Sequence, residues 1–162
     1  MKAFTPLLDI DSVLPILSEI AIFGGMTDEQ MHAILTLLET GVYAVKEPVF
    51  EKGEEPTHVY IVKRGKIELS ITDGEIVLEK KGLTVGDCFG LASLMAMHRH
   101  TATAVALEPS EVIVLSRSAL IRLQKEDCRL FSLLMMNVSR ELARRLKLTD
   151  ELLLQHLRPE DA

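Results

Sequence analysis

The chain has 162 residues, 48% of them hydrophobic, and a formal net charge of −6 at pH 7. This length allows one buried core and one projecting element, and the negative charge argues against the broad positive field of nucleic-acid binding. No apolar stretch approaches the ~20 residues that span a bilayer and no secretory run begins the chain, so we expect a cytoplasmic protein without membrane contact. The cysteines, Cys88 and Cys128, have neither a disulfide-framework nor a zinc-ligand spacing.

The first forty residues have the periodicity of helices. Apolar residues recur at helical intervals over 11–20, and the glycines after Phe23 end this segment. Thr27, with Gln30 three residues later, predicts a capping box that opens a second helix. We expect that helix to run to about Glu39, because Gly41 would terminate it.

From Val42 the hydrophobic period changes to two, which is typical of β-strands. The segments 66–72 and 75–80 flank Asp73-Gly74, a two-residue turn that predicts a hairpin. The segment 86–100 lacks alternation and indicates a turn with a short helix. Further strands are expected at 42–45, 48–50, 58–63, 101–107 and 111–115. About eight short antiparallel strands predict a mainly β fold, a double-stranded β-roll of the jelly-roll type with flanking N-terminal helices.

After Ser116 the pattern returns to helix, over 118–125 and then over 128–157. A helix of about 30 residues would extend ~45 Å, more than a compact roll covers, so we expect two copies of the chain to pair through it. The alternative is that the helix bends back onto its own domain. The predicted organisation is a β-roll with N-terminal helices at 1–126 and a dimerisation helix at 127–162. The apolar stripe of that helix comprises Phe131, Leu134, Val138, Leu142, Leu146, Thr149, Leu153 and Leu157.

Short glycine-containing strings mark the ends of the predicted strands: Gly53-Glu54, Arg64-Gly65, and Gly86-Asp87 ahead of Phe89-Gly90. In this order and spacing they resemble the cyclic-nucleotide-binding domain of the cAMP receptor protein group and of the regulatory subunits of cAMP-dependent protein kinase. The resemblance covers about residues 20–157. It implies a homodimeric regulatory domain of signal transduction whose ligand is a cyclic nucleotide, cAMP or cGMP.

The resemblance also implies a ligand site. In the family a phosphate-binding cassette points backbone N–H groups and an arginine at the cyclic phosphate, and a glutamate accepts from the ribose hydroxyl. That cassette maps onto 89–103, and a threonine at the place of Thr149 contacts the adenine partly across the dimer. The candidate ligand-binding residues are therefore Gly90, Leu91, Ala92, Arg99, His100, Thr101 and Thr149.

Two anchors of the family's cassette differ in this chain. Leu91 stands where the glutamate would be, and His100 where the kinase-type spacing places the phosphate arginine. Losing both could lower cyclic-nucleotide affinity by about two or more orders of magnitude. Arg99, one residue away, could replace the lost guanidinium if the loop shifts by one position.

Several residues have a functional and a plainer interpretation. Cys88, Met95, Met97, His98 and His100 could ligate haem or a metal, although core packing and exposed histidines explain them more simply. Thr149 could contact a base, or it could simply be a polar residue at an otherwise apolar position between two paired helices. Arg144-Arg145, with Glu141 nearby, is expected to form a solvated helix face.

No enzyme motif is present: there is no nucleophile elbow, P-loop or metal-ligating H-E-x-x-H string. In the cAMP receptor protein group the DNA-reading helix-turn-helix follows the long helix, and the chain ends at Ala162, so no DNA binding is expected. We therefore expect a non-catalytic sensor whose bound ligand alters the paired helices. The alternatives are a degenerate domain that acts as a dimerisation or protein-interaction scaffold, and a haem or redox sensor on the same fold.

Overall fold

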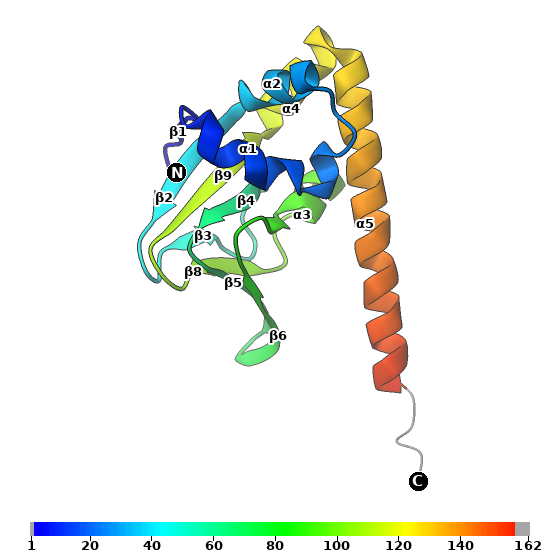
Figure 1. The fold of residues 1–162 in the computed structure, drawn as a ribbon. Coiled ribbons are helices and arrows are strands. Elements are labelled where there is room, and N and C mark those ends of the chain that lie inside the picture. Colours follow the sequence, from blue (N-terminus) through cyan, green and yellow to red (C-terminus); the bar gives the residue numbers. More distant parts are fainter. Residues whose placement is uncertain (1, 158–162) are drawn as a thin grey trace.

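A computed structural model describes residues 2–157, apart from the side chains of residues 78 and 79. Two antiparallel sheets form a β-roll, and helices cover one side of it (Figure 1). The five-stranded sheet has the order β1-β2-β9-β4-β7, and the four-stranded sheet has the order β3-β8-β5-β6. The strands are β1 (Thr5–Pro6), β2 (Leu38–Tyr43), β3 (Pro48–Phe50), β4 (His58–Arg64), β5 (Ile67–Asp73), β6 (Ile76–Leu83), β7 (Cys88–Phe89), β8 (Thr103–Ala106) and β9 (Ser110–Ser116). The predicted mainly β roll is confirmed.

The helices also follow the predicted order. They are α1 (Ile10–Ser18), the short 3-10 helix η1 (Ala21–Phe23), α2 (Asp28–Leu35), α3 (Leu91–Ala96), α4 (Arg117–Glu126) and α5 (Cys128–Leu157). The capping box at Thr27 and Gln30 is present, with both reciprocal hydrogen bonds. The predicted end of α2 at about Glu39 is wrong: the helix stops at Leu35, because residues 38–43 pair with β9 along the whole of β2. The hairpin between β5 and β6 is confirmed, with Gly74 at a φ of 57°. Its two-residue loop is 74–75 and not 73–74, because Asp73 still pairs with Ile76 at the end of β5.

Alternation along the central strands divides the interior into two cores. On β4, Val59 and Ile61 face the helices, whereas Tyr60 and Val62 face the second sheet. β9 alternates in the same way, with Ile113 and Leu115 on the helix side. The five-stranded sheet is thus apolar on both faces, which explains the near-continuous hydrophobic run of β4.

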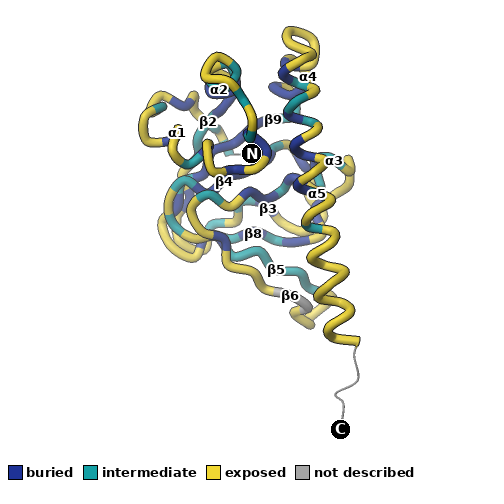
Figure 2. Tube along the Cα trace, turned by 45° about the vertical axis from the view of Figure 1, so that its right-hand side comes forward, coloured by how far each residue is buried: buried dark blue, intermediate teal, exposed yellow. Residues whose placement is uncertain are grey.

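Helix α5 runs along one side of the roll and its C-terminal half extends past it (Figure 1). Figure 2 shows the change in burial along this helix, from buried and intermediate residues near α4 to exposed residues toward the C-terminus. Its buried residues, Leu130, Leu134, Asn137, Val138 and Glu141, all lie in the first half. Residues 158–162 of the predicted C-terminal unit lie outside the described part of the chain.

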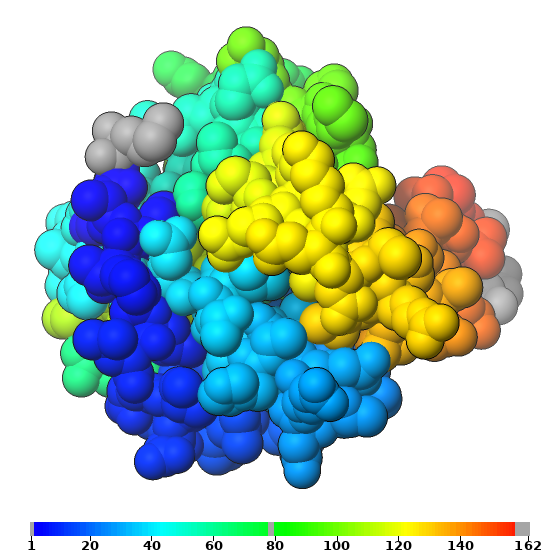
Figure 3. All heavy atoms as spheres, turned by 90° about the horizontal axis from the view of Figure 1, so that it is seen from above, coloured from blue at the N-terminus to red at the C-terminus, as the bar shows by residue number. Residues whose placement is uncertain are grey.

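The first half of α5 is fastened to the N-terminal segment by a buried amide. The Asn137 side-chain nitrogen donates to the carbonyl oxygens of Ile22, at 3.2 Å, and Gly24, at 2.8 Å. These two carbonyls belong to η1 and the turn that follows it, so Asn137 connects η1 directly to the long helix. In the view of Figure 3 the N-terminal helical segments lie beside α4 and the start of α5 on one face of the molecule.

Candidate functional site

The segment that matches the family's cassette is built around a left-handed glycine. β7 ends at Phe89, Gly90 adopts a φ of 74° and a ψ of −8°, and α3 begins at Leu91. A Cβ on Gly90 would lie 3.0 Å from Tyr60 Cδ2 and 3.2 Å from the His58 carbonyl oxygen. Gly90 is therefore needed both for its backbone conformation and for the close approach of β4.

Leu91, at the position of the family's ribose-binding glutamate, packs in the core beneath the helices. Its side chain is 1% exposed and lies among Ile22, Val59 and Leu134. The void between these side chains measures only about 10 Å³, so this core is filled. By contrast, Ala92 and Thr101 are exposed.

His100 faces the interior of the roll. Its imidazole is 3% exposed and stacks on the Phe50 ring, with the ring centroids 3.7 Å apart and the planes 9° from parallel. Burial lowers the pKa of His100, and the charge of Glu54 opposes this only in part, so the ring is neutral at pH 7. Phe50 also contacts Tyr60 and Phe89, which places His100 at the edge of an aromatic cluster.

Arg99 points in another direction, toward the turn before β4. Its guanidinium donates to the Gly53 carbonyl oxygen at 2.7 Å and pairs with the Glu55 carboxylate at 2.7 Å. The backbone of His100 binds the same turn, since its N–H donates to the Glu54 carbonyl and its own carbonyl accepts from Gly53 N–H. In this arrangement the Arg99 guanidinium fastens two loops together on the surface.

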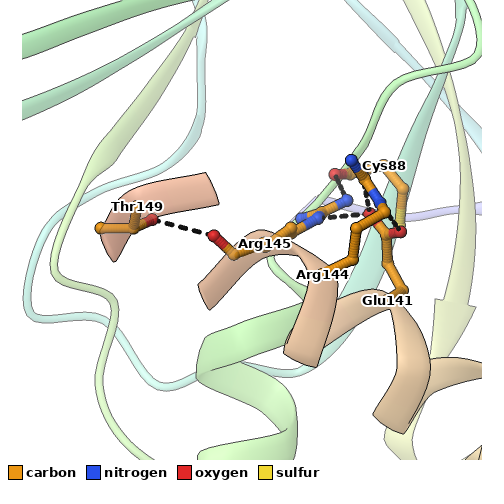
Figure 4. Close-up of polar contacts among 5 residues, drawn as sticks. All are labelled: Cys88, Glu141, Arg144, Arg145 and Thr149. Atoms are coloured by element: carbon orange, nitrogen blue, oxygen red, sulfur yellow. Dashed lines mark hydrogen bonds and ion pairs between the residues drawn. The ribbon is translucent and has the colours of Figure 1, made fainter. Parts of the chain in front are cut away.

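A cavity with a volume of about 670 Å³ lies between the roll and α5. Pockets of roughly 300–1,000 Å³ hold ligands of nucleotide size. Of the predicted site residues its lining includes only Thr149, whose hydroxyl donates to the Arg145 carbonyl oxygen at 3.0 Å (Figure 4). The other lining residues come from η1 and the residues before it, β5, β6, β7 and the turn before it, and α5: Glu19, Ile20, Ala21, Ile22, Leu69, Lys81, Leu83, Gly86, Asp87, Cys88, Glu141, Arg144, Arg145, Leu148 and Leu152.

The polar wall of this cavity is an ion-pair cluster on α5, which Figure 4 shows. Arg144 donates to the Glu141 carboxylate through Nε and Nη2, both at 2.9 Å, and Arg145 Nε donates to it at 2.6 Å. Arg145 Nη2 also donates to the Cys88 carbonyl oxygen at 3.0 Å, which joins α5 to β7. The hydrogen bonds from Arg144, and to a smaller extent that from Arg145, hold the pKa of Glu141 below its usual value, although burial acts in the opposite direction.

Contrary to expectation, the helix face at Arg144-Arg145 is not fully solvated, because Glu141 is buried there. Its side chain is only 6% exposed, whereas that of Arg144 is 60% exposed. The sequence did contain a signal for the pairing, since Glu141 precedes Arg144 and Arg145 by three and four residues. The burial of Glu141 depends on the packing of α5 against the roll, which the spacing does not specify.

The possible soft and imidazole ligands do not converge. Met97 is 77% exposed, His98 is exposed, and His100 is stacked inside the roll. Cys88 is buried, and desolvation raises its thiol pKa to about 12. Within residues 2–157, no group of three or more His, Cys, Asp or Glu side chains could hold a metal ion. Nor does any described helix combine the length and apolar character needed to cross a bilayer.

A β-roll with a glycine-bounded cassette and a long helix closing a cavity defines a domain of the cyclic-nucleotide-binding class. Residues 40–127 match the family model of the cyclic nucleotide-binding domain, and the chain belongs to this family. The predicted resemblance is thereby confirmed.

Relatives of known name and structure agree with this assignment. The chain is 32% identical over 117 residues to the cyclic nucleotide-gated channel beta-3 of Canis lupus familiaris, covering 70% of this chain and 15% of the channel. It is 29% identical over 132 residues to the cyclic AMP receptor protein of Thermus thermophilus, covering 80% of this chain and 58% of that protein. A cyclic nucleotide-binding domain from Methylobacillus flagellatus has the same fold, with a TM-score of 0.79 at 18% identity over 94% of this chain and 86% of its own. The chain therefore spans only part of the named relatives.

Proposed function

We propose that this chain is a non-catalytic regulatory sensor domain that acts as a homodimer and binds a small ligand, cAMP or cGMP by family, in the cavity beside α5. The observation that carries the proposal is this cavity of about 670 Å³, which α5 bounds through Arg145 and Thr149. Because the same helix continues beyond the roll, a ligand in the cavity would bias the angle or position of the helix. The coupling residue in this proposal is Thr149.

Dimerisation is supported by the exposed half of α5. Of the predicted stripe, Leu134 and Val138 are buried against the chain's own domain, but Leu146, Leu153 and Leu157 are 63%, 57% and 69% exposed. An apolar seam of this length at helical spacing fits a second copy of the same helix. The unbroken course of α5 to Leu157 supports pairing over the alternative of a helix bent back onto its own domain.

Sedimentation equilibrium tests the dimer. The double variant Leu146→Glu/Leu153→Glu is expected to be monomeric at concentrations at which the parent chain is dimeric, because charges at seam positions oppose pairing. Leu8→Glu is the matched control, since Leu8 is 88% exposed and lies outside α5. A parent chain that sediments as a monomer, or a double variant that stays dimeric, would contradict the dimer.

Calorimetric titration with cAMP, cGMP and cyclic dinucleotides tests the ligand. We expect saturable heat for cAMP or cGMP, together with a rise in the unfolding temperature that depends on ligand concentration. Thr149→Ala should weaken binding, whereas Thr36→Ala, outside the cavity lining, should not. The absence of heat and of thermal shift for every nucleotide would refute ligand sensing.

A specific observation favours a second candidate function, that of a dimerisation or protein-interaction scaffold without ligand. Leu91 is packed in the core and His100 is neutral and stacked on Phe50, so neither supplies the carboxylate or guanidinium that the family's cassette uses. A chain that dimerises and shows no heat with any nucleotide would favour this second function over ligand sensing.

A further inference from the structure

The cluster of Glu141, Arg144 and Arg145 has a geometry that is suited to a bound oxyanion. Two guanidinium groups converge on one carboxylate, with three hydrogen bonds of 2.6–2.9 Å (Figure 4). All three residues line the cavity beside α5. Guanidinium groups bind phosphate oxygens with the same planar donors that they use for carboxylates. Glu141 therefore holds the position that a phosphate of a cavity ligand would take.

The position of this cluster differs from that of the cassette. Residues 90–101 do not line the cavity, Arg99 is engaged with Gly53 and Glu55, and His100 is neutral. Arg144 and Arg145, by contrast, both line the cavity, and Lys81 from β6 adds a third positive charge to its wall. The cationic groups that could meet an anionic ligand thus come mainly from α5.

Among the acidic residues that line the cavity, Glu141 has the strongest effect on the two arginines. Of the acidic lining residues, Asp87 accepts hydrogen bonds from the backbone N–H and the hydroxyl of Thr84, and the Glu19 residue is exposed. Glu141 alone among them is paired with the two arginines. With Glu141 ionised, its charge offsets one of the two guanidinium charges and lowers the attraction for an incoming anion.

We propose that Arg144 and Arg145 form the phosphate-recognition site of this cavity and that the ligand's phosphate must displace the Glu141 carboxylate from them. This inference rests on the proposed function, because it specifies where a nucleotide's anionic group binds. The ligand class is a small phosphate ester of nucleotide size. Glu141 sets the affinity by competing with the ligand for the same donors.

The test compares cAMP with adenosine by calorimetry, because the two share base and ribose and differ in the phosphate. Glu141→Gln removes the competing charge and is expected to tighten cAMP binding about tenfold while changing adenosine binding less than about twofold. Arg145→Gln should weaken cAMP binding by about tenfold or more and leave adenosine binding within the same twofold.

Matched variants separate this effect from general changes of charge. Glu151→Gln and Arg140→Gln make the same substitutions on α5 at exposed residues outside the cavity lining, and neither should change the ratio of cAMP to adenosine affinity. Thermal unfolding checks that each variant is folded. If Glu141→Gln does not fold, Arg144→Gln and Arg145→Gln still test the site through the same ratio.

The outcomes distinguish the inference from the proposed function. Binding of cAMP that is the same in the parent chain, Glu141→Gln and Arg145→Gln would overturn the arginine site and leave ligand sensing intact. Equal affinities for cAMP and adenosine in the parent chain and in Glu141→Gln would also overturn it. No binding of either compound by the parent chain or by Glu141→Gln would overturn both.

Discussion

The buried amide of Asn137 gives a sharp test of how α5 is attached to the rest of the domain. In Asn137→Leu the carbonyl oxygens of Ile22 and Gly24 lose their donors, and the leucine cannot replace either hydrogen bond. A buried polar group left unsatisfied costs about 1–3 kcal/mol. The hydrogen bond to the Ile22 carbonyl is buried and the one to the Gly24 carbonyl is partly buried, so the second loss should cost less than the first. We therefore expect a total loss of about 2–4 kcal/mol in the free energy of unfolding.

Urea denaturation followed by circular dichroism measures this change, at one fixed protein concentration because the proposed dimer would couple stability to concentration. In a chain of this size the unfolding temperature should fall by roughly 5–15 °C. Amide exchange should also become faster in η1, which would lose its link to the long helix. Gln155→Leu, an exposed position on the same helix, is the control and should change stability by less than about 0.5 kcal/mol. An Asn137→Leu variant as stable as this control would show that the two carbonyls do not depend on α5.

Three further predictions concern the cassette. Burial lowers the pKa of His100 below the ordinary histidine value of about 6.5, so the folded state disfavours its protonation and stability falls as pH drops below about 6.5. The loss in urea midpoint between pH 7.5 and 5.0 should be smaller in His100→Phe, and an equal loss would contradict this prediction. Gly90→Ala should lower the free energy of unfolding by more than Gly53→Ala does: both glycines have positive φ, but only at Gly90 would the added Cβ contact Tyr60 and the His58 carbonyl. Equal losses in urea denaturation would refute this packing argument. Arg99→Ala should change the cAMP affinity measured by calorimetry by less than about twofold, because the Arg99 guanidinium binds the 53–55 turn. A tenfold loss of affinity would instead favour Arg99 as the missing phosphate anchor.

Much of the fold follows from local sequence signals. The capping box at Thr27 and the hairpin turn are determined by residues three or fewer positions apart. The capping box is present as predicted, and the hairpin is present with its two-residue loop one position later, at 74–75. The bounds of α5, 128–157, follow from an apolar period sustained over the whole segment. The end of α2 was predicted wrongly because β2 pairs with β9, more than sixty positions away in the sequence. The local sequence of the helix does not indicate this long-range pairing.

The candidate site was less predictable than the fold. Family spacing located the cassette at Gly90 and identified Leu91 and His100 as departures from the family's pattern. It could not show that His100 stacks on Phe50 or that Arg99 turns toward Gly53, because these contacts depend on how separate loops meet. Glu141 was missed as a cavity residue for the same reason: its neighbours on the helix suggested solvent, while its burial comes from the roll.

The junction between the two halves of α5 gives the domain a mechanical property. From Glu141, which is held at the roll, to Leu157 the helix extends about 24 Å at a rise of about 1.5 Å per residue, and every residue after Arg145 is exposed. A tilt of about 5° at this pivot would displace the far end by about 2 Å, roughly a third of a helical turn. In the proposed dimer, a rotation too small to disturb the core would therefore move the leucines of one helix out of register with those of the partner helix.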